Sequence, residues 1–143
     1  SINKLKNIKT FDFGVGHKEM NCTMSSLDKV YDEMKNGHNK GGLGIGHGGE
    51  SIVIKTLDSL ELPGLDFMKI DVEGLGLQVL EGFGEKLKNT KYIQIELEVS
   101  QVWENQSYYN DVVNYLKNQG FEILDEIDLD GTQKDVLFKN INL

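Results

Sequence analysis

From Asp66 to Lys139 the chain alternates strand patterns with helix patterns, and this alternation limits the available folds more than any other feature. Strand patterns at 66–72 and 92–99 are each followed by apolar residues at helical spacing, over 74–88 and 107–120. Parallel neighbours joined by helices need right-handed crossover connections. The predicted fold class is therefore α/β, with a mostly parallel sheet.

The two ends of the chain carry weaker patterns. Residues 121–129 and 134–139 flank Asp130-Gly131, a turn signal that predicts a C-terminal antiparallel hairpin. Towards the N-terminus, 9–15 and 51–55 each predict a short strand, and Thr56 to Leu60 predicts a single capped turn that ends before Pro63. Residues 36–50 are polar and rich in glycine, which predicts a mobile loop.

Length and composition indicate a single domain over residues 1–143, because a chain of this size can bury one sizeable core. The net charge is −8 and the basic residues are all lysines, which argues against binding to a nucleic-acid backbone. No run approaches the roughly 20 apolar residues of a membrane span. Cys22 is the single cysteine, so we expect no disulfide framework, a reducing compartment and a cytoplasmic protein.

Two neighbouring strand patterns each carry a polar row. On the first strand, Lys69, Asp71 and Glu73 share one face, and on the second Glu96 does so with other polar residues. If the rows lie on the same side of the sheet, Lys69 can pair with Glu96, while Asp71 and Glu73 reach the carboxyl-end crevice where open α/β sheets bind ligands. A structural network of ion pairs explains the pattern equally well.

Two other candidate patterns carry less weight. Gly44-x-Gly46-x-x-Gly49 has the spacing of a dinucleotide fingerprint, but a strand rather than a helix follows it, so it lacks the helix N-terminus that binds phosphate. The three histidines have no i, i+4 partner and no carboxylate at ligand spacing, and we predict no metal site. These residues are His17, His38 and His47.

A set of motifs resembles the FkbM family of S-adenosylmethionine-dependent methyltransferases. The motifs are Thr56-Leu57-Asp58-Ser59-Leu60, Lys69-Ile70-Asp71-Val72-Glu73-Gly74, Val79-Leu80-Glu81-Gly82 and Ile93-Gln94-Ile95-Glu96. Their order and spacing also resemble the family, from about Phe11 to the C-terminus. One departure is local, because the family reads Glu-Gly-Ala-Glu where this chain has Glu73-Gly74-Leu75-Gly76.

The resemblance implies a Rossmann-like class I methyltransferase fold with strand order 3-2-1-4-5-7-6. Residues 66–72 and 92–99 then form strands 4 and 5, the C-terminal hairpin forms strands 6 and 7, and Phe11 to Val15 forms strand 3. The family's glycine-rich cofactor turn follows strand 1, which this mapping places before Ser1. We therefore expect a partial, N-terminally truncated fold.

The resemblance also implies S-adenosylmethionine as cofactor, with Gly14, Gly16 and Asp71 as its candidate contacts in this chain. Reading Gly14 to Gly16 as the glycine-rich turn itself is disfavoured. Only 57 positions separate Gly14 from Asp71, too few for two further βα units of about 30 residues each.

The implied reaction is methylation of a hydroxyl group on a small-molecule or sugar acceptor. Because a sulfonium leaving group needs little acid assistance, the enzyme must chiefly position and deprotonate the acceptor. Asp71 or Glu73 is the expected base or acceptor-orienting group, and Glu96 is expected to hold Lys69 and balance the local charge. The sequence does not indicate which acceptor is used.

In the implied strand order, strand 4 lacks a neighbour on one side. Bare strand edges recruit partners, so we expect a homo-oligomer formed through this edge, or an N-terminal strand that folds back onto strand 4. Two other functions stay open. One is a non-catalytic interaction module that self-associates through the edge, and the other is a different nucleotide-binding enzyme that uses Asp71 and Glu73 on a metal.

Overall fold

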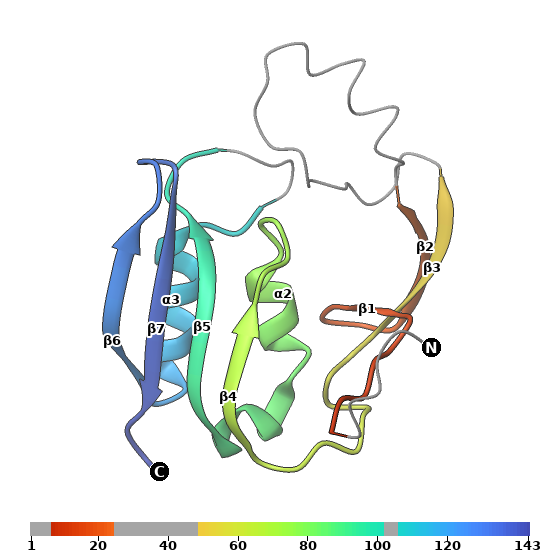
Figure 1. Ribbon diagram of the computed structural model, residues 1–143, viewed down its shortest axis with the longest axis horizontal. Coiled ribbons are helices and arrows are strands. Elements are labelled where there is room, and N and C mark those ends of the chain that lie inside the picture. The colour runs from red at the N-terminus through yellow and green to blue at the C-terminus, as the bar shows by residue number, and fades with distance from the viewer. Residues whose placement is uncertain (1–6, 25–48, 102–105) are drawn as a thin grey trace.

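The computed structural model describes residues 7–24, 49–101 and 106–143, and Figure 1 shows their arrangement. Most of the predicted loop at 36–50 lies outside these residues. The described chain forms two mixed sheets, one of four strands and one of three. The expectation of a single sheet is therefore wrong, although the α/β class is confirmed.

The four-stranded sheet has the order β4-β5-β7-β6, in which β4 (Leu65–Ile70) pairs in parallel with β5 (Thr90–Glu98). The last strand, β7 (Gln133–Asn140), inserts antiparallel between β5 and β6 (Phe121–Asp128). Three of the four strands consequently run in the same direction. This order confirms the predicted sequence of strands 4-5-7-6 and the C-terminal hairpin.

The smaller sheet contains β1 (Gly14–Val15), β2 (Met20–Met24) and β3 (Glu50–Lys55), in the order β1-β3-β2. The predicted strand at 9–15 shortens to two residues, and the rings of Phe11 and Phe13 make a tilted contact with centroids 5.2 Å apart. β1 pairs with β3 rather than with β4. The expectations that this strand joins the main sheet or folds back onto β4 are wrong.

The predicted helix at 74–88 is divided. α2 (Gly76–Glu81) ends at Gly82, and a 3-10 helix, η1 (Gly84–Asn89), follows it. Gly84 has φ +57°, a left-handed conformation that no α-helix contains. The helix predicted from about residue 107 is confirmed as α3 (Tyr109–Asn118), with Gly120 at φ +88° after its end.

Both α-helices pack on the same face of the four-stranded sheet, where the core lies (Figure 1). The apolar residues of each strand alternate towards this face, which explains the pattern read from the sequence. Its fully buried members include Leu80, Phe83, Leu87, Ile93, Ile95, Leu97, Val112, Leu116, Val136 and Phe138. Within the described residues, no helix covers the opposite face of this sheet.

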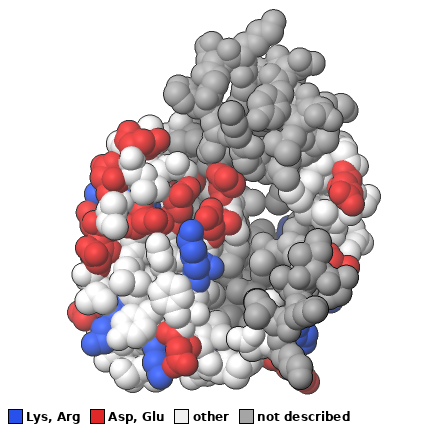
Figure 2. All heavy atoms as spheres, in the orientation of Figure 1, with Lys and Arg blue, Asp and Glu red and all other residues white. Residues whose placement is uncertain are grey.

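That opposite face carries the polar rows. Figure 2 shows it in the orientation of Figure 1, with acidic side chains gathered over the upper part of the sheet. The strand register brings Lys69 beside Gln94 and Glu96 beside Asp135. Phe67, lower on the same face, is 53% exposed. The two sides of this sheet therefore differ. In the described part of the chain, one side is apolar and packs against the helices, and the other carries acidic side chains over its upper part.

Candidate active site

The acidic side chains gather at the carboxyl ends of β4 and β5. Asp71 follows the last residue of β4, and Glu96 lies near the end of the adjacent parallel strand β5. Carboxyl ends of parallel strands are where open α/β sheets bind ligands. The two polar rows lie on the same side of the sheet, because the parallel register places Lys69 beside Gln94.

The ion pair in this cluster differs from the predicted one. Lys69 Nζ lies 3.0 Å from Asp71 Oδ2, and both side chains are about half exposed. The hydrogen bond and the charge of Asp71 raise the pKa of Lys69. Glu96 instead accepts a hydrogen bond of 2.8 Å from Gln133 Nε2 of β7. The expected Lys69–Glu96 pair is therefore replaced by one within β4 and its following residue, because Asp71 lies two positions along the same face.

Glu73 lies in a strained turn directly after β4. It has φ +50°, the only non-glycine positive φ among the described residues, and Gly74 follows at φ +84°. The Leu75 amide donates to the Val72 carbonyl at 3.3 Å, which closes the turn. Two consecutive positive φ angles define a type I′ turn, in which glycine and asparagine are the usual residues. A non-glycine residue keeps this conformation only where the surrounding structure holds it there.

The environment of Glu73 favours its protonated form. Burial raises the pKa of Glu73, and three neighbouring carboxylates raise it further. These belong to Glu96, Asp71 and Glu98. Its Oε2 is buried and has no hydrogen-bond partner among the described residues. A carboxyl group with a raised pKa accepts a proton more readily than an ordinary glutamate, which suits a general base.

Burial likewise raises the pKa of Glu96, and the charges of Asp71 and Asp135 add to the effect while Lys69 opposes it. Asp135 comes from β7, where residues 134–139 were read only as a hairpin strand. Sequence reasoning missed it because the β5–β7 pairing that places it opposite Glu96 joins residues far apart in the chain. Its Oδ1 is also buried without a partner in the described part of the chain.

The structure adds Ser107 to the site, a residue that was not among the predicted site residues. Its hydroxyl donates to the Gly74 carbonyl at 2.9 Å, and this contact joins residues 33 positions apart. Ser107 thereby ties the start of α3 to the turn that carries Glu73. The single signal in the sequence was its place just before a predicted helix, where serine commonly caps.

Gly14 and Gly16 have packing roles in the structure. The Gly16 amide donates to the Lys55 carbonyl at 3.0 Å, so it is used in pairing β1 with β3. A Cβ at Gly14 would lie 2.5 Å from Ile54 Cδ1, and one at Gly82 would collide with the Gly16 carbonyl oxygen. These glycines allow close backbone approach, and their contact with a cofactor stays a prediction.

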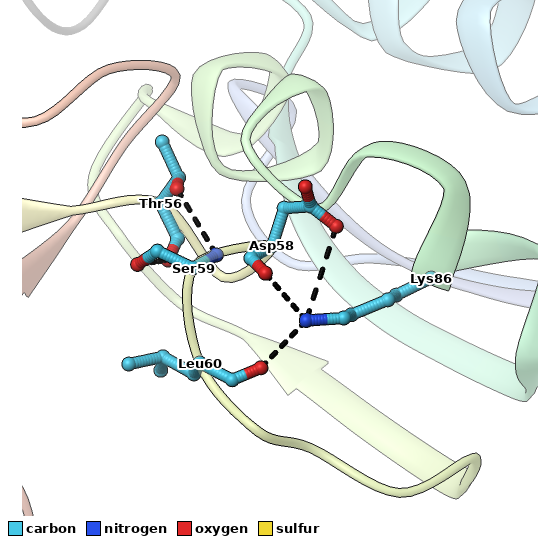
Figure 3. Close-up of polar contacts among 5 residues, drawn as sticks. All are labelled: Thr56, Asp58, Ser59, Leu60 and Lys86. Carbon is cyan, nitrogen blue, oxygen red and sulfur yellow. Dashed lines mark hydrogen bonds and ion pairs between the residues drawn. The ribbon is translucent and has the colours of Figure 1, made fainter.

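The Thr56–Leu60 motif forms the expected single turn, and Figure 3 shows how it is held. The Ser59 hydroxyl donates to the Thr56 carbonyl at 2.8 Å, and the Ser59 amide donates to Thr56 Oγ1 at 3.3 Å. From η1, Lys86 Nζ donates to the carbonyls of Asp58 and Leu60 and lies 3.9 Å from Asp58 Oδ1. Lys86 thereby holds the Thr56–Leu60 turn against η1.

Over the described ranges 7–24, 49–101 and 106–143, no group of three or more histidine, cysteine or acidic residues is placed to hold a metal ion. His38 and His47 lie outside these ranges. None of the described helices is long and apolar enough to cross a membrane.

Comparison with known proteins identifies the family. The sequence model of the methyltransferase FkbM domain matches residues 4–123, which are 120 of the 143 residues. The searches of curated proteins and of solved structures give no significant match. The match spans every motif from Thr56 to Glu96 and confirms the resemblance read from the sequence. The chain therefore belongs to the FkbM methyltransferase domain family, a family of S-adenosylmethionine-dependent methyltransferases.

Proposed function

We propose that this protein transfers the methyl group of S-adenosylmethionine to a hydroxyl group of a small molecule or sugar. Glu73 or Asp71 would accept the hydroxyl proton or orient the acceptor. The observation that carries the proposal is the strained turn after β4, which holds a half-buried glutamate of raised pKa beside three other carboxylates. Strained backbone and shifted pKa values both concentrate at active sites.

The residues at the end of β4 fit part of the implied cofactor. S-adenosylmethionine carries a cationic sulfonium and ammonium as well as ribose hydroxyls, and carboxylates suit all of these groups. Asp71 is the residue that would hold it, since its carboxylate lies at the end of β4 and is about half exposed. The Gly16 amide does not suit the cofactor's carboxylate, because it already donates to Lys55.

When bound, the cofactor supplies a methyl group on a sulfonium, a leaving group that needs no acid. The chain's own residues then have two tasks, to place the acceptor oxygen in line and to remove its proton. Lys69 pairs with Asp71 at 3.0 Å and so positions its carboxylate at the end of β4.

Three substitutions test these roles in the protein as the cell makes it. Glu73→Gln and Asp71→Asn each remove a carboxylate from the site and are expected to lower methyl transfer about a hundredfold or more. Asp66→Asn is the matched control, because Asp66 pairs with Lys91 in an exposed contact near the start of β4. Formation of S-adenosylhomocysteine is measured against a panel of sugars and hydroxylated small molecules. Full activity of both site variants would overturn the assignment.

A second function is favoured by the outer edge of β4. Within the described residues, β4 pairs only with β5, and Phe67 on this strand is 53% exposed. Unpaired strand edges with apolar side chains promote self-association, so we propose that two copies pair through β4. Light scattering of the chain and of Phe67→Lys tests this. We expect a dimer for the chain and a monomer for the variant, and a monomer in both cases would contradict it.

A further inference from the structure

The turn after β4 has a conformation that its own residues do not favour. Glu73 and Gly74 both have positive φ, and the turn itself contributes one long hydrogen bond, the 3.3 Å contact from the Leu75 amide to the Val72 carbonyl. A non-glycine residue persists in the left-handed region only where surrounding structure holds it there. The support for Glu73 must therefore come from outside the turn.

Ser107, which lies just before α3, supplies that support. Its amide donates to the Gly74 carbonyl at 2.8 Å, and its hydroxyl donates to the same oxygen at 2.9 Å. The same hydroxyl oxygen accepts from the Leu77 amide at 3.3 Å. One side chain thus contacts the turn on its left-handed glycine and on the first residues of α2. Ser107 is 7% exposed, so water competes little for these bonds.

The position of Ser107 is itself fixed by its neighbour. Tyr108 forms an isolated parallel bridge with Glu98, the last residue of β5, and begins the capping box of α3 through Asp111. Glu98 is almost fully buried, and it is one of the carboxylates that act on Glu73. The end of β5, the start of α3 and the turn after β4 are therefore joined at this point.

We propose that Ser107 is a positioning residue that holds the Val72–Leu75 turn so that the Glu73 carboxyl group faces the acidic site. It acts through the Gly74 carbonyl and the Leu77 amide and does not touch substrate. The inference rests on the proposed role of Glu73 in methyl transfer. It predicts that loss of the Ser107 hydroxyl releases the turn and lets the Glu73 carboxyl group move away from its acidic neighbours into water.

The test follows the Glu73 carboxyl group by carbon-13 NMR titration of the labelled 143-residue chain. In Ser107→Ala, the pKa of Glu73 is expected to fall towards the ordinary glutamate range, because burial and like charges no longer act fully. Ser107→Thr keeps the hydroxyl and is expected to retain the raised pKa. Tyr115→Phe is the matched control, because it removes another hydrogen bond from α3, to the Leu80 carbonyl, far from the turn. An unchanged Glu73 titration in Ser107→Ala would overturn the proposal, as would the same fall in Tyr115→Phe.

A measurement on the unaltered chain covers the case in which Ser107→Ala does not fold. Amide hydrogen exchange of Leu77 and Ser107 is expected to be slow and to follow a common opening. The Leu77 amide donates to the Ser107 hydroxyl and the Ser107 amide donates to the Gly74 carbonyl, so both bonds break when Ser107 leaves the turn. Exchange of Leu77 at the rate of an exposed turn amide would overturn the proposal.

These readouts need no methyl transfer, so they separate two failures. If the pKa of Glu73 falls in Ser107→Ala but Glu73→Gln retains full activity, the positioning role of Ser107 is supported and the role of Glu73 as a base is contradicted. If Glu73→Gln loses activity but the pKa of Glu73 is unchanged in Ser107→Ala, the role of Glu73 as a base is supported and the positioning role of Ser107 is contradicted.

Discussion

Two turns of this molecule carry family motifs, and they are built in opposite ways. The Thr56–Leu60 turn satisfies its polar groups internally and binds Lys86 with two backbone carbonyls (Figure 3). The Val72–Leu75 turn holds a glutamate at positive φ and leaves one of its carboxylate oxygens buried without a partner in the described chain.

The difference separates stability from function. A satisfied, unstrained turn lowers the energy of the fold, whereas a strained and acidic turn raises it and persists where the strain serves another purpose. Substitutions in the first turn should therefore destabilise the fold, while the right substitution in the second should stabilise it and impair catalysis. Four experiments test this contrast.

The largest effect is expected from Gly82→Ala. The Gly82 carbonyl accepts the Asp58 amide at 2.9 Å, and a methyl group at Gly82 would collide with the Gly16 carbonyl oxygen. Backbone atoms cannot move aside cheaply, so urea unfolding should show a loss of about 3 kcal/mol. Gly131→Ala is the control, since a Cβ there meets nothing within 4 Å and only its positive φ matters, a cost of about 1 kcal/mol. Equal losses in both variants would mean that the close approach does not restrain the fold.

Lys86→Met should destabilise the chain by about 2 kcal/mol, because it removes charge-assisted hydrogen bonds and leaves two carbonyls without their donor. Lys88→Met provides the comparison. Lys88 pairs with Glu85 in an exposed contact on the same 3-10 helix, and such pairs contribute less than about 1 kcal/mol. If urea midpoints of the two variants coincide, Lys86 does not secure the Thr56–Leu60 turn.

Glu73→Asn should have the opposite sign and raise stability by about 1 kcal/mol, since asparagine tolerates the left-handed conformation. Glu73→Gln removes the same charge but keeps the unfavourable backbone. The difference between these two variants in urea unfolding therefore measures the strain itself. A turn that is not strained would give the same stability for both.

The smallest effect concerns pH. Because burial and neighbouring carboxylates raise the pKa of Glu73 in the folded chain, the folded state binds this proton more tightly than the unfolded state does. The resulting stability is fully present below the unfolded pKa of about 4.3 and is lost as pH rises through the folded value. The unaltered chain should thus lose stability relative to Glu73→Gln between acid and neutral pH. A constant difference between them, measured by unfolding across this range, would contradict the raised pKa.

The main sheet could be predicted because its signals are local. Alternating apolar residues in 92–99, helical spacing before Gly120 and the Asp130-Gly131 turn each lie within a few neighbouring positions, and they predicted the strands, the helix and the hairpin. The strand order β4-β5-β7-β6 was implied by the resemblance to the FkbM family. The polar face with Asp71 and Glu96 followed from the same period of two.

The predictions that differ from the structure depend on contacts that hydrophobic periodicity and residue propensity do not encode. Lys69 pairs with Asp71 rather than with Glu96, a choice made by side-chain geometry at the strand end. Ser107 acts on a carbonyl 33 positions away, and no local pattern reports that distance. The strand predicted at 9–15 is shortened to Gly14–Val15 because only these two residues pair with β3, and the alternation of Phe11 and Phe13 does not report that lack of a partner.

The place of β7 between β5 and β6 has a consequence for how the protein is made. On the ribosome, β5 and β6 emerge before the strand that must join them, so neither can complete its pairing until Asn140 has left the exit tunnel. Until then the nascent chain exposes strand edges that favour aggregation, and sheet closure depends on contacts distant in sequence. These edges stay exposed from the emergence of β6 until β7 has left the tunnel and joined both strands.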